Sequence, residues 1–208
     1  WKPDYGPAQR HESAGVTAIG ARNFLIAYNI NLNTRDKRVA TDIAFDIREK
    51  GRNKRDKMGK FLRDKEGNPI KSPGILKSCK AVGWYIEEYN LAQISMNLTD
   101  FDITPPHVAF EETRKQARKR GVRVIGSELV GLIPLDAIIA AGRYYLKQQH
   151  CSIGIPTKDI IHIAVKSMGL DDLSPFDPNE KIIEYRIKDL YGPLASKTVH
   201  AFADELSS

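Results

Sequence analysis

Residues 24–32 (FLIAYNINL) alternate in polarity along the chain. One set of alternate positions is apolar throughout, whereas the other set includes Asn29 and Asn31. Successive side chains of a strand point to opposite faces of a sheet. The segment therefore predicts a strand with one strongly apolar face and one partly polar face.

Residues 81–90 and 91–100 predict two further strands, joined as a hairpin around the polar residues 88–90. The second strand repeats the alternation of residues 24–32 and again has two distinct faces. Its apolar face would carry Ala92, Ile94, Met96 and Leu98, and its polar face Gln93, Ser95 and Asn97.

Helical spacing of apolar residues follows the first strand. Val39, Ile43 and Ile47 would form one stripe, with Thr34 as the N-cap and Gly51 as the stop signal. The sequence therefore predicts a helix between the first strand and the basic segment 50–80.

A second helix is predicted to start at Pro105, with Thr104 as its cap and Gly121 at its end. Acidic residues precede basic ones within it, which suits the helix dipole. The remaining pattern predicts a strand at 122–134, helices at about 135–149 and 157–168, and a short strand at 182–187.

The element order is thus β-α-loop-β-β-α-β-α-α-β, and we find no internal repeat. This order predicts an α+β fold, a two-layer α/β sandwich. We expect a mixed or antiparallel sheet with helices on one face and ferredoxin-like character.

Positive charge is concentrated in residues 50–80, which hold eleven basic and three acidic residues, a net charge of +8 against +6 for the whole chain. The segment lacks apolar periodicity and contains several helix breakers, which is typical of a long mobile loop. It could bind nucleic acid or another polyanion. We favour a solvated insertion, because the aromatic residues that single-strand binders interleave are missing.

The composition of the 208 residues, 41% hydrophobic and 28% charged, is that of a folded protein. No stretch is long enough to cross a bilayer and no signal peptide is visible, so we expect no membrane partner. Cys79 and Cys151 cannot build a disulfide framework, which favours a cytoplasmic location. Both ends look cut, so we interpret the chain as a piece of a longer protein.

Most motifs of catalysis are missing from the sequence, including the nucleophile elbow, the zinc-protease motif and the phosphate-binding loop. None of the five histidines has a second ligand at metal spacing, so we assign no metal. We expect His162, between two isoleucines on a helix, to be structural. His107, at a predicted helix start, is a minor candidate for catalysis.

Uncharged hydrogen-bonding side chains are concentrated on the polar faces of the strands at 24–32 and 91–100. A freely solvated face usually carries charged residues instead. Amides without charge are typical of a half-buried surface that binds a flat polar ligand, or of a wet interface with another domain. Chance alternation is the remaining alternative. If the two strands are neighbours, the candidate site comprises Asn29, Asn31, Gln93, Ser95 and Asn97.

Five segments carry a family resemblance: GVTAIGAR running into FLIAYNINL, GWYIEEYNLAQISMNL, PPHVAFEE, GSELVGLIPLDA and LSPFDPNEKIIEY. Together they resemble the C-terminal subdomain of glutamate formiminotransferase over roughly residues 1–187, with the basic segment as the main departure. Residues 194–208 resemble the first helix of the cyclodeaminase domain that follows in bifunctional enzymes. We therefore divide the chain into a formiminotransferase subdomain (1–187) and a linker with a truncated cyclodeaminase start (188–208).

The resemblance implies a transferase that moves a formimidoyl group between N5 of tetrahydrofolate and L-glutamate in histidine degradation. In this family two similar subdomains hold folate in a tunnel between them, and the catalytic histidine lies in the N-terminal subdomain. We therefore assign no catalytic residue to this chain and expect it to be inactive alone. We expect tetrahydrofolate as a substrate, no metal, and self-association through the exposed interface.

One wall of that folate site is the role that we expect for the five polar residues and for Arg22. Arg22 lies just before the first strand, where its guanidinium could pair with a substrate carboxylate. Two alternatives remain open: a nucleic-acid-binding module that uses residues 50–80, or a non-catalytic interface domain that orients a cyclodeaminase-like domain.

Overall fold

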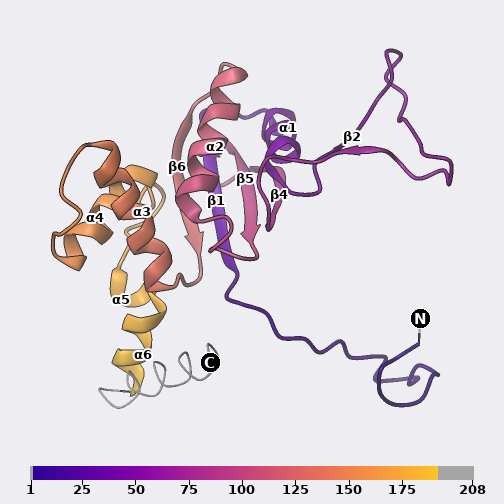
Figure 1. Ribbon diagram of the computed structural model, residues 1–208, viewed down its shortest axis with the longest axis horizontal. Helices are drawn as coiled ribbons and strands as arrows, with labels where there is room; N and C mark the ends of the chain where they lie inside the picture. Colours follow the sequence, from indigo (N-terminus) through magenta and orange to yellow (C-terminus); the bar gives the residue numbers. More distant parts are fainter. Residues whose placement is uncertain (1, 192–208) are drawn as a thin grey trace.

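The computed structural model describes residues 2–191, and its centre is a four-stranded sheet in the order β4-β5-β1-β6 (Figure 1). All neighbouring strands are antiparallel. The strands are β1 (Ile26–Leu32), β4 (Cys79–Ile86), β5 (Leu91–Leu98) and β6 (Val124–Val130).

Two helices connect these strands on one side of the sheet: α1 (Lys37–Ile47) joins β1 to the hairpin, and α2 (Pro106–Lys119) joins the hairpin to β6. The four strands and two helices thus form the split β-α-β-β-α-β arrangement of ferredoxin-like folds. This confirms the α+β sandwich and selects the antiparallel sheet from the two that the sequence allowed.

Four further helices complete the described chain: α3 (Leu135–Gln148), α4 (Thr157–Met168), α5 (Pro178–Lys181) and α6 (Ile183–Tyr191). Helix α3 packs against α2, and α4 packs against α3. Among residues 2–191, no helix has the length and hydropathy needed to cross a membrane.

The apolar face of the sheet is buried beneath α1 and α2. Tyr28, Ile30 and Ile94 are fully buried there, together with Ile43 and Ile47 of the predicted stripe of α1, whereas its third member, Val39, is partly buried. Helix α1 lies so close to β4 that a Cβ atom added at Gly83 would come within 2.1 Å of the Thr41 backbone nitrogen. The alternation read from the sequence therefore defines the core.

Both predicted N-caps lie one or two residues away from the observed ones. Asp36 caps α1, and its carboxylate accepts a hydrogen bond from the backbone of Arg38 at 2.8 Å. Pro105 occupies the N-cap position of α2. The Thr104 hydroxyl instead donates to the Lys77 carbonyl at 2.7 Å and so fixes the chain that leads into β4.

The predicted strand at 182–187 is wrong, because α6 begins at Ile183. Only Ile182 is extended, in a single parallel bridge to Ile133, and its side chain is fully buried. Six residues with mixed apolar positions fit both a strand and a helix. The predicted domain boundary at 187/188 falls inside α6, and the cyclodeaminase-like segment at 194–208 lies outside the described residues.

The basic segment forms a forked arm, not the irregular mobile loop expected from its sequence. At its base, β2 (Arg52–Asn53) pairs with β3 (Lys71–Ser72). Beyond the base the chain makes two tight turns, closed by bridges from Arg55 to Phe61 and from Arg63 to Pro69. The arm projects away from the sheet (Figure 1).

The two turns of this arm are copies of one eight-residue unit, RDKMGKFL (55–62) and RDKEGNPI (63–70). In each copy the aspartate accepts backbone hydrogen bonds from the residues two and four positions later. The arginine of each donates to the glycine carbonyl at 2.6 Å. The glycines have φ of 82° and 84°, a region that favours glycine. The chain therefore does contain a short internal repeat.

Four charged side chains anchor the base of the arm to the helices. Arg52 and Arg120 both pair with Asp42, at 2.8 and 2.7 Å, and both also pair with Asp46. Burial by itself would raise the pKa of Asp42, but hydrogen bonds from the two guanidinium groups hold it below its usual value. The arm is thus fixed to α1 and to the end of α2.

Candidate functional site

The polar positions of β1 and β5 lie side by side on the sheet face opposite α1 and α2. In the ladder, Asn29 faces Ser95, Asn31 faces Gln93, and Asn97 faces an alanine of β1. The two strands are therefore neighbours, as the candidate site requires. We call the surface that these five residues form the amide face.

Gln93 lies at the centre of a hydrogen-bond network on the amide face. Its side-chain oxygen accepts from the Trp84 indole at 2.8 Å. Its side-chain nitrogen donates to Asn31 Oδ1 at 2.8 Å and to Glu128 Oε2 at 3.4 Å. These partners explain how Gln93 and Asn31 are fully buried yet polar.

Two carboxylates accept hydrogen bonds from this network, and both lie on the β6 side of β1. Glu128, on β6, faces Asn29 in the ladder and accepts a hydrogen bond from its amide at 3.2 Å. Asp172, which follows α4, accepts from the Asn31 amide at 3.1 Å. A Cβ atom at Gly126 would come within 2.3 Å of Asp172, so glycine makes room for that side chain over the sheet.

The segment that carries Asp172 is fixed along the edge of β6 by Ser127. The Ser127 backbone donates to the Gly169 carbonyl at 2.8 Å, and its hydroxyl donates to the Met168 carbonyl at 2.7 Å. Residues far apart in the sequence are thus held on one surface by backbone contacts.

The side chains that border the amide face, Glu128 and Asp172, carry negative charge. Within the described part of the chain, no lysine, arginine or histidine forms an ion pair with Glu128 or Asp172. Glu128 is half-buried and Asp172 is exposed. A carboxylate offers about four acceptor positions, so both retain capacity for a donor-rich ligand.

The remaining predicted site residues lie at the margin of the network or outside it. Ser95 is half-buried and Asn97 is exposed. Arg22 is exposed in the segment before β1, and its guanidinium donates to the Asn23 carbonyl at 3.1 Å. Among the described residues, no hydrogen bond joins Arg22 to the amide face.

Sequence analysis missed three members of the network: Trp84, Glu128 and Asp172. A signal was available for Glu128, which is the single charged side chain in the strand VIGSELV. Trp84 occupies an alternate position of β4, opposite Gln93 in the ladder. Asp172 comes from a turn, and no periodicity could connect it with β1.

The minor catalytic candidate lies on the other side of the sheet. His107, in the first turn of α2, is buried and stacks on Tyr144 of α3 with ring centroids 4.7 Å apart. Burial lowers its pKa, and the Glu111 carboxylate opposes this effect. His162 lies on α4 with its side chain exposed, so it is not part of the core. Neither histidine joins the amide network.

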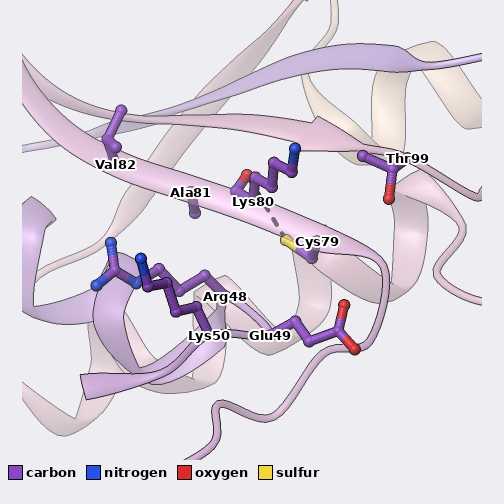
Figure 2. A pocket seen from close by; sticks show the side chains of 8 residues that line it. All are labelled: Arg48, Glu49, Lys50, Cys79, Lys80, Ala81, Val82 and Thr99. Atoms are coloured by element: carbon purple, nitrogen blue, oxygen red, sulfur yellow. Dashed lines mark hydrogen bonds between the residues drawn. The ribbon is translucent and has the colours of Figure 1, made fainter. Parts of the chain in front are cut away.

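A hollow of about 460 Å³ lies beside β4, at the end of α1 (Figure 2). One of its cations already has local contacts, since Arg48 donates to the Gly51 carbonyl and stacks on Phe45. Burial, assisted by the Glu49 carboxylate, raises the pKa of Cys79 to about 12, so this thiol is a poor nucleophile. We find no catalytic base in the hollow.

A second hollow, of about 910 Å³, lies between α2 and the start of β6 and is lined mainly by basic side chains. Neither hollow includes a residue of the amide face. Within residues 2–191, no group of three or more potential metal ligands lies together. The amide face is therefore the best-organised polar surface of the described chain.

Comparison with known proteins gives a family match over the region of the chain that contains the sheet. The family model of the formiminotransferase domain matches residues 27–188, which includes every strand of the sheet except the first residue of β1. The chain is 41% identical to formimidoyltransferase-cyclodeaminase of Rattus norvegicus, over 100% of this chain and 36% of the relative. Glutamate formimidoyltransferase of Streptococcus pyogenes serotype M1 is 40% identical, over 71% of this chain and 42% of the relative.

The chain spans about a third of the length of the bifunctional relatives that it matches, including that of Dictyostelium discoideum at 42% identity. The family match covers most of the described residues, and the relatives from Rattus norvegicus and Dictyostelium discoideum align over the whole chain. The chain therefore belongs to the formiminotransferase domain family.

Proposed function

We propose that this chain is the C-terminal subdomain of a glutamate formimidoyltransferase and that its amide face forms one wall of the tetrahydrofolate site. The observation that carries the proposal is the network of Asn29, Asn31 and Gln93, fixed on the sheet face that α1 and α2 leave uncovered. Fixed amides with defined partners are typical of surfaces that bind a flat polar ring.

The chemistry of formimidoyl transfer fits a site that two subdomains share. Attack of N5 of tetrahydrofolate on the formimidoyl carbon needs a base for the N5 proton and an acid for the leaving glutamate nitrogen, and the reverse reaction exchanges these roles. It also develops positive charge on the transferred group, which fixed acceptors stabilise. The amide face provides acceptors, including Glu128, but the described residues offer it no histidine. We therefore place the acid–base groups in the N-terminal subdomain, which would pack on this face.

The same proposal names the partners of the chain. They are tetrahydrofolate and L-glutamate as substrates, the N-terminal formiminotransferase subdomain, and a cyclodeaminase domain in the bifunctional form. The sheet face opposite α1 and α2 would be an interface in the whole enzyme, and without the N-terminal subdomain we expect self-association. Two free cysteines, Cys79 buried and Cys151 exposed, fit a reducing cytoplasm.

An assay of formimidoyl transfer to tetrahydrofolate tests the proposal. The chain is assayed alone and after mixing with a separately produced N-terminal subdomain from the family. We expect turnover only in the mixture, because each wall by itself holds half of the reacting geometry. Turnover by the chain alone would show that it has its own base, and His107 would be the first residue to replace.

A further inference from the structure

We propose that Glu128 is the residue that binds an amidine-type edge of the substrate, in which N–H groups flank one carbon. This inference rests on the proposed function and deepens it, because it names the chemical group that the amide face recognises. Three observations carry it: the way Glu128 is held, the charge around it, and its place in the sheet.

The carboxylate of Glu128 is held in a fixed orientation. Oε2 accepts from the Asn29 amide at 3.2 Å and from the Gln93 amide at 3.4 Å. Gln93 is itself fixed by the Trp84 indole and by Asn31. Because a carboxylate has about four acceptor positions, the hydrogen bonds to Oε2 leave Oε1 available for a ligand.

No salt bridge pairs the charge of Glu128 within the described part of the chain. The side chain is half-buried, and no ion pair to it forms within residues 2–191. A half-buried carboxylate without a cation is best matched by a ligand that is positively charged or rich in N–H donors. If this side chain only supported its neighbours, an uncharged amide could accept the same hydrogen bonds without burying a charge.

Glu128 lies beside the polar side chains of the amide face. It lies in one row of the ladder with Asn29 and Ser95, on the strand next to β1. Asp172 lies on the same face, with one oxygen held by Asn31. The face therefore presents two carboxylates along its β6 side, next to the neutral amides of β1 and β5, which suits a flat group with N–H donors along one edge.

Two parts of the substrates carry such an edge. The formimidoyl group is itself an amidine, and the pterin ring of folate carries a 2-amino group next to a ring N–H. Both present N–H donors on the nitrogens that flank one carbon. The structure assigns the recognition of that edge to Glu128, and the experiment identifies the source.

The test compares Glu128→Gln with the unchanged chain, each mixed with the N-terminal subdomain. Glu87→Gln, an exposed change on the β4–β5 turn, is the matched control. Binding of 5-formyltetrahydrofolate reports on the pterin edge, because that ligand has the ring but a formyl oxygen in place of the imine nitrogen. The KM and kcat for N-formimidoyl-glutamate report on the amidine itself. Thermal unfolding checks that the variant folds.

We expect Glu128→Gln to weaken one of these interactions about tenfold to a hundredfold, the range for loss of a charge-assisted hydrogen bond. Weaker binding of 5-formyltetrahydrofolate identifies the pterin, and a higher KM or lower kcat at unchanged folate binding identifies the formimidoyl group. If neither changes in a folded, active mixture, the role of Glu128 is wrong and the proposed function stands. If the unchanged mixture neither binds folate nor turns over, the proposed function itself fails.

Discussion

The two faces of the sheet are formed by the same strands but differ in how their side chains are held. On the covered face, Ile30 and Ile94 are fully buried against helices and need no specific partner. On the amide face, Asn31 and Gln93 are equally buried, but each is held by directed hydrogen bonds. The first face stabilises the fold by area, whereas the second holds polar groups in defined positions. Burial alone therefore does not distinguish an apolar core from a polar network, whereas the hydrogen-bond partners do.

Loss of a covered-face side chain should have the largest effect on stability. Ile94→Ala removes a fully buried side chain from the core, and we expect it to lower the free energy of unfolding by about 2–5 kcal/mol. Urea unfolding measures this change. The adjacent Ser95→Ala, on the amide face, is the control and should cost less than about 1 kcal/mol. Equal losses at the two positions would contradict the division between the faces.

A change at the centre of the amide network should cost less stability and more binding. Gln93→Met keeps the volume but leaves the Trp84 indole and Asn31 without their partner. We expect a loss of about 1–3 kcal/mol in the free energy of unfolding, because buried polar groups become unsatisfied. Isothermal calorimetry with 5-formyltetrahydrofolate on the mixture with the N-terminal subdomain should show weakened affinity. Retained affinity would remove Gln93 from the site.

A lower pH should reduce the free energy of unfolding through His107, which lies on the covered side of the sheet. Its pKa is lowered in the folded state, mainly by burial, so the unfolded chain binds a proton more readily. The free energy of unfolding should therefore fall as the pH drops through the ordinary histidine range, about 6.5, toward the lowered value. Thermal unfolding between about pH 7.5 and pH 5.5 measures this fall. His107→Phe should reduce the slope, and an unchanged slope would show that another group titrates.

Removal of the forked arm should have the smallest effect on folate binding. Replacing residues 54–70 with a short glycine turn keeps the β2–β3 base and its anchor on Asp42. Because the arm projects away from the sheet (Figure 1), the affinity of the mixture for 5-formyltetrahydrofolate should not change. The same variant tests the nucleic-acid alternative: that hypothesis requires salt-dependent binding to RNA or DNA that disappears with the arm. A large loss of folate affinity would place the arm at the site.

Local alternation predicted much of this molecule, and long-range contacts account for what it missed. The strands at β1 and β5 and the amide positions Asn29 and Gln93 followed from a period of two. Asp172 lies 141 residues from its partner Asn31 in the sequence, so no local pattern could indicate it. The segment at 182–187 is too short to distinguish the period of a strand from that of a helix, and the strand predicted there is wrong.

The forked arm was missed for a different reason. Apolar periodicity is the wrong signal for it, because its order comes from aspartates and arginines that bond to their own turns. A search for repeated polar motifs would have found the two RDK units. Charge and breaker content alone therefore do not establish that a segment lacks structure.

The most direct test of the amide face as a folate-binding wall is a nitrogen-15 NMR titration of the chain in the mixture with its N-terminal subdomain. The side-chain amides of Asn29, Asn31 and Gln93 and the Trp84 indole are followed as 5-formyltetrahydrofolate is added. Gln149, which lies at the end of α3, serves as the reference. We expect the four signals of the network to shift with folate while Gln149 stays constant. Saturable folate binding that leaves all four signals unmoved would show that the wall lies elsewhere.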